Sequence, residues 1–347
     1  MPKTSTGKPP FFIIGVPRSG TTLLSVMLSN HPEVYVDGDS VGMPLARLYR
    51  RYLRGNCASN ADEAGAFLQK LLARSYKGRL QRLTEGVLWD AGSESLQEFF
   101  FRAVCAFAER QGKKMWGDKT PELNFYLQEI IQLFPDAKFI HLLRDPRPNA
   151  WSLHQRQLYP LPLAAQYWRE INGMACAQRN LLGADRFLIL KYEDLLQYPR
   201  ESMEEVCSFL GLPFVEEVLD PGKNISTLSA DAYVKPKLDA TRLEAWKEKM
   251  TTSQIREVER IVADLMLELN YTPEYIREAS PLSPLRIFLL RRRLMRKMLF
   301  TGKRFQMVGR KWAMQKIPFS RRLKNFFFGS LKQVFSKDFL RVFGYKD

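Results

Sequence analysis

The chain has 347 residues, of which 45% are hydrophobic and 26% are charged, and this length can bury one large core or one domain with an appendage. No uncharged apolar run approaches the ~20 residues that a membrane-spanning helix needs. The first apolar run starts at Phe11. We therefore predict no signal peptide, transit peptide or transmembrane helix.

The formal net charge of +16 is concentrated at one end of the chain. Residues 281–347 contain 18 of the 53 basic residues and two of the 37 acidic residues. The first 280 residues therefore hold 35 residues of each sign and are neutral overall. This asymmetry predicts a neutral domain over residues 1–280 and a basic extension over residues 281–347.

The four cysteines are Cys57, Cys105, Cys176 and Cys207, and they match no metal-ligand or redox spacing. Because no secretory segment is expected, we predict no disulfide framework either. We interpret the cysteines as free thiols in a reducing compartment, which predicts a cytoplasmic protein.

Apolar patterns predict strands that alternate with helices along the chain. Extended segments are predicted from residue 11, over 34–39, at the start of 114–121, over 137–144 and over 186–190. Helical patterns cover residues 43–54, 61–74, 95–110 and 163–182. Two more helices are predicted, one from Pro121 to about 133 and one that follows Arg147 and reaches about 157. A loop over 221–239 precedes two helices that end near 269. This alternation is typical of an α/β fold with a central parallel sheet flanked by helices.

Residues 11–24 read FFIIGVPRSGTTLL, which predicts a strand, a tight turn and a helix. Such a junction binds anions because backbone N–H groups and the positive end of the helix dipole converge there. The guanidinium of Arg18 and the hydroxyls of Thr21 and Thr22 add to this site. The loop lacks the Gly-Lys-Ser/Thr ending of a nucleotide P-loop, so we predict a phosphate site that is not built for ATP.

Polar side chains follow the predicted strands at one edge of the sheet. Arg18, Lys119, Arg144 and Tyr192 each come just after a predicted strand end. Ligands of parallel α/β sheets bind at the carboxyl ends of the strands, and these ends share an edge. We therefore expect the four side chains to converge.

Four motifs together resemble the sulfotransferase superfamily: GVPRSGTTLL, GDKTP, RDPR with Ser152 eight residues after Arg144, and KYEDL. The resemblance covers residues 10–270. It implies a P-loop-like, three-layer fold that binds 3′-phosphoadenosine 5′-phosphosulfate (PAPS) and transfers the sulfuryl group without a metal. Within the superfamily, residues 12–40 look most like tyrosylprotein sulfotransferases.

The resemblance implies a role for each residue of the first loop. The backbone amides of Ser19, Gly20, Thr21 and Thr22, with the two threonine hydroxyls, would hold the 5′-phosphate. Arg18 would stabilise the charge that develops on the bridging oxygen as the sulfuryl group leaves. A guanidinium suits this task because it contacts two oxygens at once and stays charged at any working pH.

Arg144 and Ser152 look like the pair that binds the 3′-phosphate in this family. Arg156 lies one turn beyond Ser152 on the same helix face and is a third candidate contact. Such a site distinguishes the donor from ATP, because ATP would leave these cationic donors unpaired. We interpret Arg147 as a surface residue or an ion-pair partner.

Three further residues match family positions around the donor. Lys119 would contact the sulfuryl group or the bridging oxygen; the alternative is a lysine paired with Asp118. Tyr192 would stack on the adenine or, alternatively, belong to the core. Lys235 would close over the phosphates from a flexible loop.

The general base must take the proton of the acceptor hydroxyl. Counting from the loop, Asp39 falls where tyrosylprotein sulfotransferases carry a catalytic Glu, although its side chain is one methylene shorter and its flanks differ. Asp37 is the second candidate. The weaker candidates are His31, His141 and His154.

Residues 281–347 interleave cationic clusters with Leu, Met and Phe. This pattern is typical of an interfacial helix, so we predict a basic helical extension that contacts an anionic membrane surface. Nucleic acid is a competing partner, but RNA-recognition and zinc-finger signatures are missing and the aliphatic content favours lipid. A third interpretation is a helix that packs on the domain with its charges in solvent.

The motifs favour a PAPS-dependent sulfotransferase acting on a hydroxyl, with peptide tyrosine, saccharide, lipid and small-molecule acceptors all open. A P-loop nucleotide kinase is the alternative enzyme, and the missing Walker lysine argues against it. An inactive lipid- or nucleic-acid-binding protein is the third class. It is disfavoured because Arg18, Lys119, Arg144 and Ser152 occur together. The sequence indicates no oligomeric state.

Overall fold

The structure is a computed structural model of the chain. It describes residues 7–38, 41–54, 65–66, 68–69, 72, 78–90, 92–157, 159–222 and 238–300. Within these ranges, the side chains at 51–54, 79, 122, 156–157, 242 and 295–300 are not described. The helix predicted over 61–74 and the loop predicted over 221–239 therefore lie largely outside the described residues.

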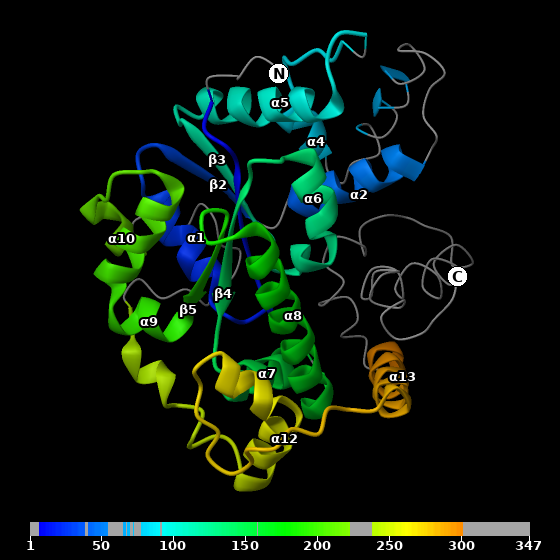
Figure 1. The fold of residues 1–347 in the computed structure, drawn as a ribbon, viewed down its shortest axis with the longest axis vertical. Helices are drawn as coiled ribbons and strands as arrows, with labels where there is room; N and C mark the ends of the chain where they lie inside the picture. The colour runs from blue at the N-terminus through cyan, green and yellow to red at the C-terminus, as the bar shows by residue number, and fades with distance from the viewer. Residues whose placement is uncertain are drawn as a thin grey trace. The chain divides into compact units, whose positions relative to one another are not determined.

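A five-stranded parallel sheet forms the centre of the fold, which confirms the prediction from the alternating pattern (Figure 1). Its strands are β1 (Phe11–Gly15), β2 (Val34–Gly38), β3 (Met115–Lys119), β4 (Lys138–Leu143) and β5 (Phe187–Lys191). The order across the sheet is β2-β3-β1-β4-β5, and every neighbouring pair is parallel. The direction of winding therefore reverses between β1 and β4, the position at which such sheets bind ligands.

Side chains of β1 point alternately to the two faces of the sheet and so contribute to two separate hydrophobic cores. Phe12 and Ile14 belong to one core, and Phe11 and Ile13 belong to the other. The first core includes residues of α2 (Gly42–Arg54), α5 (Leu96–Arg110) and α6 (Leu127–Leu133). The second includes residues of α1 (Thr21–Ser29), α9 (Tyr192–Gln197) and α10 (Pro199–Leu210). Helices thus cover both faces of the sheet, because successive side chains of a strand point to opposite faces.

Gly117, in the GDKTP motif, lets two central strands pack closely. A Cβ atom at this position would lie 2.2 Å from Cζ of Phe11, a distance that real contacts do not reach. Gly117 is also paired with Phe11 in the register of β1 and β3. The glycine is therefore explained by packing beneath the site and not by the site itself.

The segment that follows β3 departs from the predicted α-helix. Pro121–Tyr126 form the 3₁₀-helix η2, and the α-helix α6 begins only at Leu127. The remaining short elements are α4 (Arg79–Leu83) and the 3₁₀-helices η3 (Glu216–Leu219) and η4 (Ala240–Leu243). In the described part of the chain, every helix is too short or too polar to cross a lipid bilayer.

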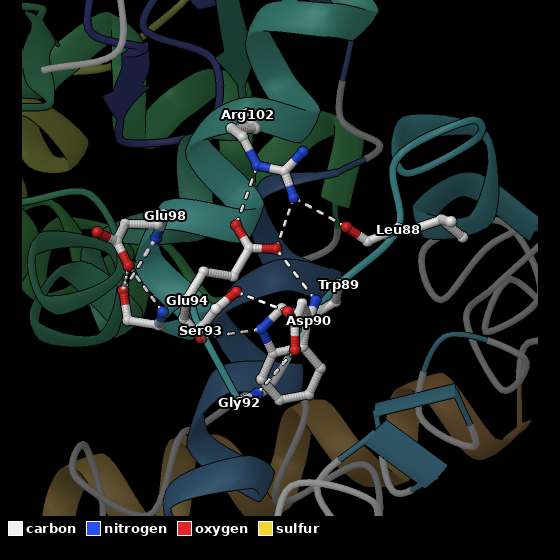
Figure 2. Close-up of polar contacts among 9 residues, drawn as sticks. Leu88, Trp89, Asp90, Gly92, Ser93, Glu94, Glu98 and Arg102 are labelled. Atoms are coloured by element: carbon white, nitrogen blue, oxygen red, sulfur yellow. Dashed lines mark hydrogen bonds and ion pairs between the residues drawn. The ribbon is translucent and has the colours of Figure 1, made fainter. Parts of the chain in front are cut away.

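A polar network fixes the chain ahead of α5 (Figure 2). The hydroxyl of Ser95 and the carboxylate of Glu98 form a reciprocal capping box at the start of the helix. One turn later, the guanidinium of Arg102 donates to the carboxylate of Glu94 at 2.9 Å and to the carbonyl oxygen of Leu88 at 2.8 Å. These contacts are structural, since none involves a predicted site residue.

The chain divides into two compact units. The first combines residues 1–145 with 170–246 and contains the sheet; the second combines 146–169 with 247–347. The described helices of the second unit are α7 (Pro146–Gln157), the start of α8 (Leu161–Leu182), α12 (Thr252–Glu268) and α13 (Pro284–Phe300). The predicted domain boundary after residue 280 follows the charge of the sequence and stays a prediction.

A buried ion pair joins two helices of the second unit. Nη1 of Arg147 on α7 lies 3.2 Å from Oε1 of Glu259 on α12, and the Glu259 side chain is completely buried. The same carboxylate accepts hydrogen bonds from the backbone N–H groups of residues 274, 275 and 276. Of the two interpretations of Arg147, the ion-pair partner is therefore confirmed and the surface residue is wrong.

Candidate active site

The loop between β1 and α1 has the geometry of an anion site. Its turn closes with a hydrogen bond from the backbone N–H of Ser19 to the carbonyl oxygen of Val16, at 3.0 Å. Gly20 is the N-cap of α1 with φ 96°, and no side chain caps the helix. The backbone N–H groups of Leu23 and Leu24 donate to the carbonyl oxygen of Gly20 at 2.9 and 3.2 Å, so the amides that a ligand would meet at the positive end of the dipole are the earlier ones, at Thr21 and Thr22.

Arg18 has an unusual backbone conformation for a residue with a side chain. Its φ is 77°, and the only other non-glycine residue with positive φ in the described part of the chain is Asn270. A left-handed arginine costs of order 1 kcal/mol, and such outliers concentrate at functional sites. The strain therefore marks Arg18 as a residue whose orientation matters.

Tyr192, the first residue of α9, lies directly against this loop. A Cβ atom on Gly20 would lie 2.4 Å from Cδ2 of the Tyr192 ring, so only glycine fits there. Tyr192 as a whole is 6% exposed. Tyr192 therefore borders the candidate phosphate site and is buried as well, so adenine stacking stays a prediction.

Arg144 connects the loop to Tyr192. Its Nη1 donates a hydrogen bond to the carbonyl oxygen of Arg18 at 2.8 Å, and its Cζ lies 4.6 Å from the centroid of the Tyr192 ring. Nearby, the backbone N–H of Asp145 donates to the Glu193 carboxylate at 3.0 Å. The ends of β1, β4 and β5 thus meet at the point where the winding of the sheet reverses.

Lys119 and Asp118 lie at the end of β3 and are both buried. Oδ2 of Asp118 accepts hydrogen bonds from the backbone N–H groups of Val41 and Gly42, at 3.2 and 2.9 Å. Its Oδ1 accepts from the Thr120 hydroxyl at 2.6 Å. Asp118 therefore anchors the start of α2. No pattern in the sequence indicated this role, because the partners are 77 and 76 residues away.

The family model described as "Sulfotransferase family" matches residues 9–217, which is more than half of the chain and includes this site. The chain belongs to the sulfotransferase family. The resemblance drawn from the four motifs is thereby confirmed.

Curated relatives of the chain include the protein-tyrosine sulfotransferase of Drosophila melanogaster, which is 25% identical over 283 residues. That alignment covers 76% of this chain and 52% of the relative. The nodulation protein NoeE of Sinorhizobium fredii is 26% identical over 289 residues, which are 75% of this chain and 65% of that protein. The chain thus spans between about half and two thirds of the length of these two relatives.

Solved structures show the same fold. The sulfotransferase domain from the olefin synthase of Synechococcus PCC 7002 has a TM-score of 0.52 at 24% identity, over 75% of this chain and 96% of that domain. The sulfotransferase domain from the curacin biosynthetic pathway has a TM-score of 0.51 at 20% identity, over 77% and 99%. The predicted P-loop-like three-layer fold is therefore confirmed.

The first candidate for the general base, Asp39, lies outside the described residues. Asp37 is on β2 and is half-buried. Burial raises the pKa of Tyr35 to about 12, and the charge of Asp37 adds to this rise. The choice between the two carboxylates stays a prediction.

The histidines have structural partners. Nε2 of His31 lies 2.9 Å from the carbonyl oxygen of Pro213, and Nε2 of His141 lies 2.8 Å from Oδ1 of Asn172. Nδ1 of His154 lies 2.6 Å from a main-chain carbonyl oxygen. Complete burial lowers the pKa of His141 to about 4, so this ring is neutral at pH 7.

Three predicted donor contacts stay predictions. Ser152 is half-buried on α7 and belongs to the second unit, whereas Arg144 belongs to the first. The side chain of Arg156, and Lys235 altogether, lie outside the described residues. The sharing of a 3′-phosphate by Arg144 and Ser152 is therefore a proposal and not an observation.

The described cysteines are thiols without a metal-binding arrangement around them. Cys105, Cys176 and Cys207 are thiols that are not in disulfides, and burial raises the pKa of Cys105 and Cys207 to about 11. Cys57 lies outside the described residues. In the described ranges, no cluster of three His, Cys, Asp or Glu side chains could hold a metal ion. The predicted cytoplasmic location stays a prediction.

Proposed function

We propose that this sulfotransferase moves the sulfuryl group of PAPS to an acceptor hydroxyl. The observation that carries the proposal is the convergence of Arg18, Gly20, Arg144 and Tyr192 at the winding reversal of the sheet. These residues come from three strand ends that are distant in sequence. The Arg144 guanidinium next to a helix N-terminus without a side-chain cap favours an anionic ligand, and the guanidinium of Arg18 would add a second permanent charge.

The residues of the loop divide the work of donor binding in this proposal. The amides of Ser19 to Thr22 hold the 5′-phosphate at the N-terminus of α1. Arg144 faces the loop from β4 and contributes charge toward the nucleotide, while Tyr192 supplies an aromatic surface. Binding of both ends of the donor would orient the sulfur for in-line attack.

The reaction breaks the bond between sulfur and the bridging oxygen and forms a bond between sulfur and the acceptor oxygen. Arg18 and Lys119 stabilise the negative charge left on the departing phosphate oxygen. The acceptor proton passes to a carboxylate, with Asp39 as the first candidate and Asp37 as the second. The products are the sulfate ester and 3′-phosphoadenosine 5′-phosphate.

Peptide tyrosine is the first acceptor to test, because several curated relatives are named protein-tyrosine sulfotransferases. The hydroxyls of saccharides, lipids and small phenols are the next acceptors to test. The chemistry at the donor is the same for all of them, so donor binding tests the proposal without knowledge of the acceptor.

Calorimetric titration with 3′-phosphoadenosine 5′-phosphate tests the proposal directly. We expect the Arg144→Ala variant to bind this nucleotide about 10- to 100-fold more weakly, as loss of a hydrogen bond to a charged group costs about 1.5–3 kcal/mol. Arg102→Ala, in the network of Figure 2, is the matched control and should bind normally. Unchanged affinity in Arg144→Ala, or tighter binding of ATP than of this nucleotide, would contradict the proposal.

A further inference from the structure

Helix α13 is fixed to the second unit along one face. Ile287 and Leu294, two helical turns apart, are 2% and 3% exposed. Just before the helix, the backbone N–H of Leu282 donates to Oε1 of Gln166 on α8 at 3.2 Å, and this bond is buried. The described part of α13 therefore has a defined inner face and a defined outer face.

The outer face of α13 exposes bulky apolar side chains. Leu285, Phe288 and Leu289 are 68%, 44% and 53% exposed. Eight large hydrophobic side chains are exposed in the described part of the chain, and three of them fall within these five positions. Single exposed hydrophobic residues are ordinary, but a cluster of this kind marks an interaction surface.

Arginines border the apolar cluster on the same exposed side. Arg286, Arg292 and Arg293 are exposed. Leu285, Leu289 and Arg292 are spaced i, i+4 and i+7, so they form one line along the helix. Residues 281–300 contain six basic residues and no acidic residue. We call Leu285, Arg286, Phe288, Leu289, Arg292 and Arg293 the outer α13 face.

We propose that the outer α13 face docks the protein on an anionic lipid surface. Leucine and phenylalanine enter the boundary between headgroups and acyl chains, and arginines reach back to the phosphates along their aliphatic stems. Nucleic acid would match the arginines but would leave the three apolar side chains in water. Lipid would satisfy both the three arginines and the three exposed apolar side chains of this face. This inference does not depend on the proposed function.

Sedimentation with vesicles tests this assignment on the full-length chain. The full chain should bind vesicles of phosphatidylcholine with 30% phosphatidylserine at about 0.1 M salt, and bind pure phosphatidylcholine at least about tenfold more weakly. Binding to the mixed vesicles should fall at about 0.5 M salt, because screening weakens the attraction of exposed charges.

Two variants separate the apolar and the basic contributions. The triple variant Leu285→Asn, Phe288→Asn, Leu289→Asn should lose at least about tenfold in partitioning, since it removes the inserted side chains. The control Leu181→Asn, Leu267→Asn changes leucines that are 69% and 50% exposed on other helices, and should bind like the wild type. Arg286→Gln, Arg292→Gln, Arg293→Gln should lose both binding and salt dependence.

Thermal unfolding of each variant checks that the fold is intact. If the triple variant has a lowered melting temperature, the single variant Leu289→Asn replaces it in the vesicle experiment. Vesicle binding by the apolar variant equal to that of the wild type would overturn the assignment. Absence of wild-type binding to anionic vesicles would also overturn it. Tighter binding to a single-stranded oligonucleotide, unaffected by the apolar variant, would overturn it in favour of nucleic acid.

Discussion

The guanidinium of Arg144 lies over the ring of Tyr192, with 4.6 Å between Cζ and the ring centroid. The same guanidinium holds the carbonyl oxygen of Arg18 at 2.8 Å. Arg144 is thus fixed by an aromatic face on one side and by the strained loop on the other. A cation held this way loses little side-chain entropy on binding an anion, which favours tight recognition.

The contact between Gly20 and Tyr192 leads to a stability prediction. We expect Gly20→Ala to lower the free energy of unfolding by about 2–5 kcal/mol, because the added Cβ clashes with the ring and the backbone φ is positive. Gly183→Ala is the matched control: its φ is 78°, and no atom lies within 4 Å of the added Cβ. It should lose only about 1–2 kcal/mol. Equal losses in urea denaturation would show that the ring does not press on the loop.

Asp118 gives a prediction that combines stability and catalysis. Asp118→Asn weakens the bonds to the start of α2 and should lower the free energy of unfolding by about 1–3 kcal/mol. Asp39, the first candidate base, lies two residues before Val41, so a weaker bond to Val41 should misplace it. We therefore expect the factor by which kcat falls to be larger than the factor by which the KM for the donor rises. The exposed Asp136→Asn is the control and should change stability by less than about 0.5 kcal/mol. A variant with altered KM alone would rule out this positioning role.

The buried ion pair of the second unit should be expensive to break. We expect Glu259→Gln to lower the free energy of unfolding by about 3 kcal/mol, because the buried Arg147 loses the nearer and fully buried of its two carboxylate partners and keeps only the partly exposed Glu274 at 3.5 Å. Glu268→Gln, at the exposed end of α12, is the control and should be nearly neutral. If both variants unfold at the same denaturant concentration, the pair contributes nothing to stability.

His141 makes stability depend on pH. The pKa of His141 is lowered from an ordinary 6.5 to about 4 in the folded protein. Between these two pH values the ring is therefore protonated in the unfolded chain and neutral in the folded protein. Stability is therefore full above pH 6.5 and falls as pH drops toward 4, by up to about 1.4 kcal/mol per pH unit. Denaturation of wild type and His141→Gln at pH 7, 6 and 5 measures this slope. The wild type should lose the larger amount, and parallel slopes would refute the assignment.

Local patterns were sufficient for the sheet and for the first loop. The apolar runs at β1, β4 and β5 and the sequence GVPRSGTT predicted both the strands and the tight turn before α1; the use of that turn as an anion site stays a prediction. The convergence predicted for Arg18, Lys119, Arg144 and Tyr192 followed from a general property of parallel sheets. The contacts of Arg144 confirm it for Arg18 and Tyr192, and for Lys119 it stays a prediction. These features depend on residues close in sequence or on a rule shared by the fold class.

Contacts between distant residues were not predictable. Asp118 reaches Val41 across 77 positions, and Arg147 reaches Glu259 across 112. Such pairs depend on how helices pack, which one sequence does not reveal. The 3₁₀-helix after Pro121 was likewise missed, since Pro suits the first turn of either helix type.

Transfer of ³⁵S from labelled PAPS, in buffer containing EDTA, tests the central claim most directly. The acceptors are a tyrosine peptide, a saccharide, a phenol and a whole-cell extract. We predict labelled product with equimolar release of 3′-phosphoadenosine 5′-phosphate, and a loss of about 10²- to 10³-fold in kcat for Arg18→Ala. Arg102→Ala should retain full activity. Failure to transfer the label to any acceptor, together with magnesium-dependent turnover of ATP, would contradict the account.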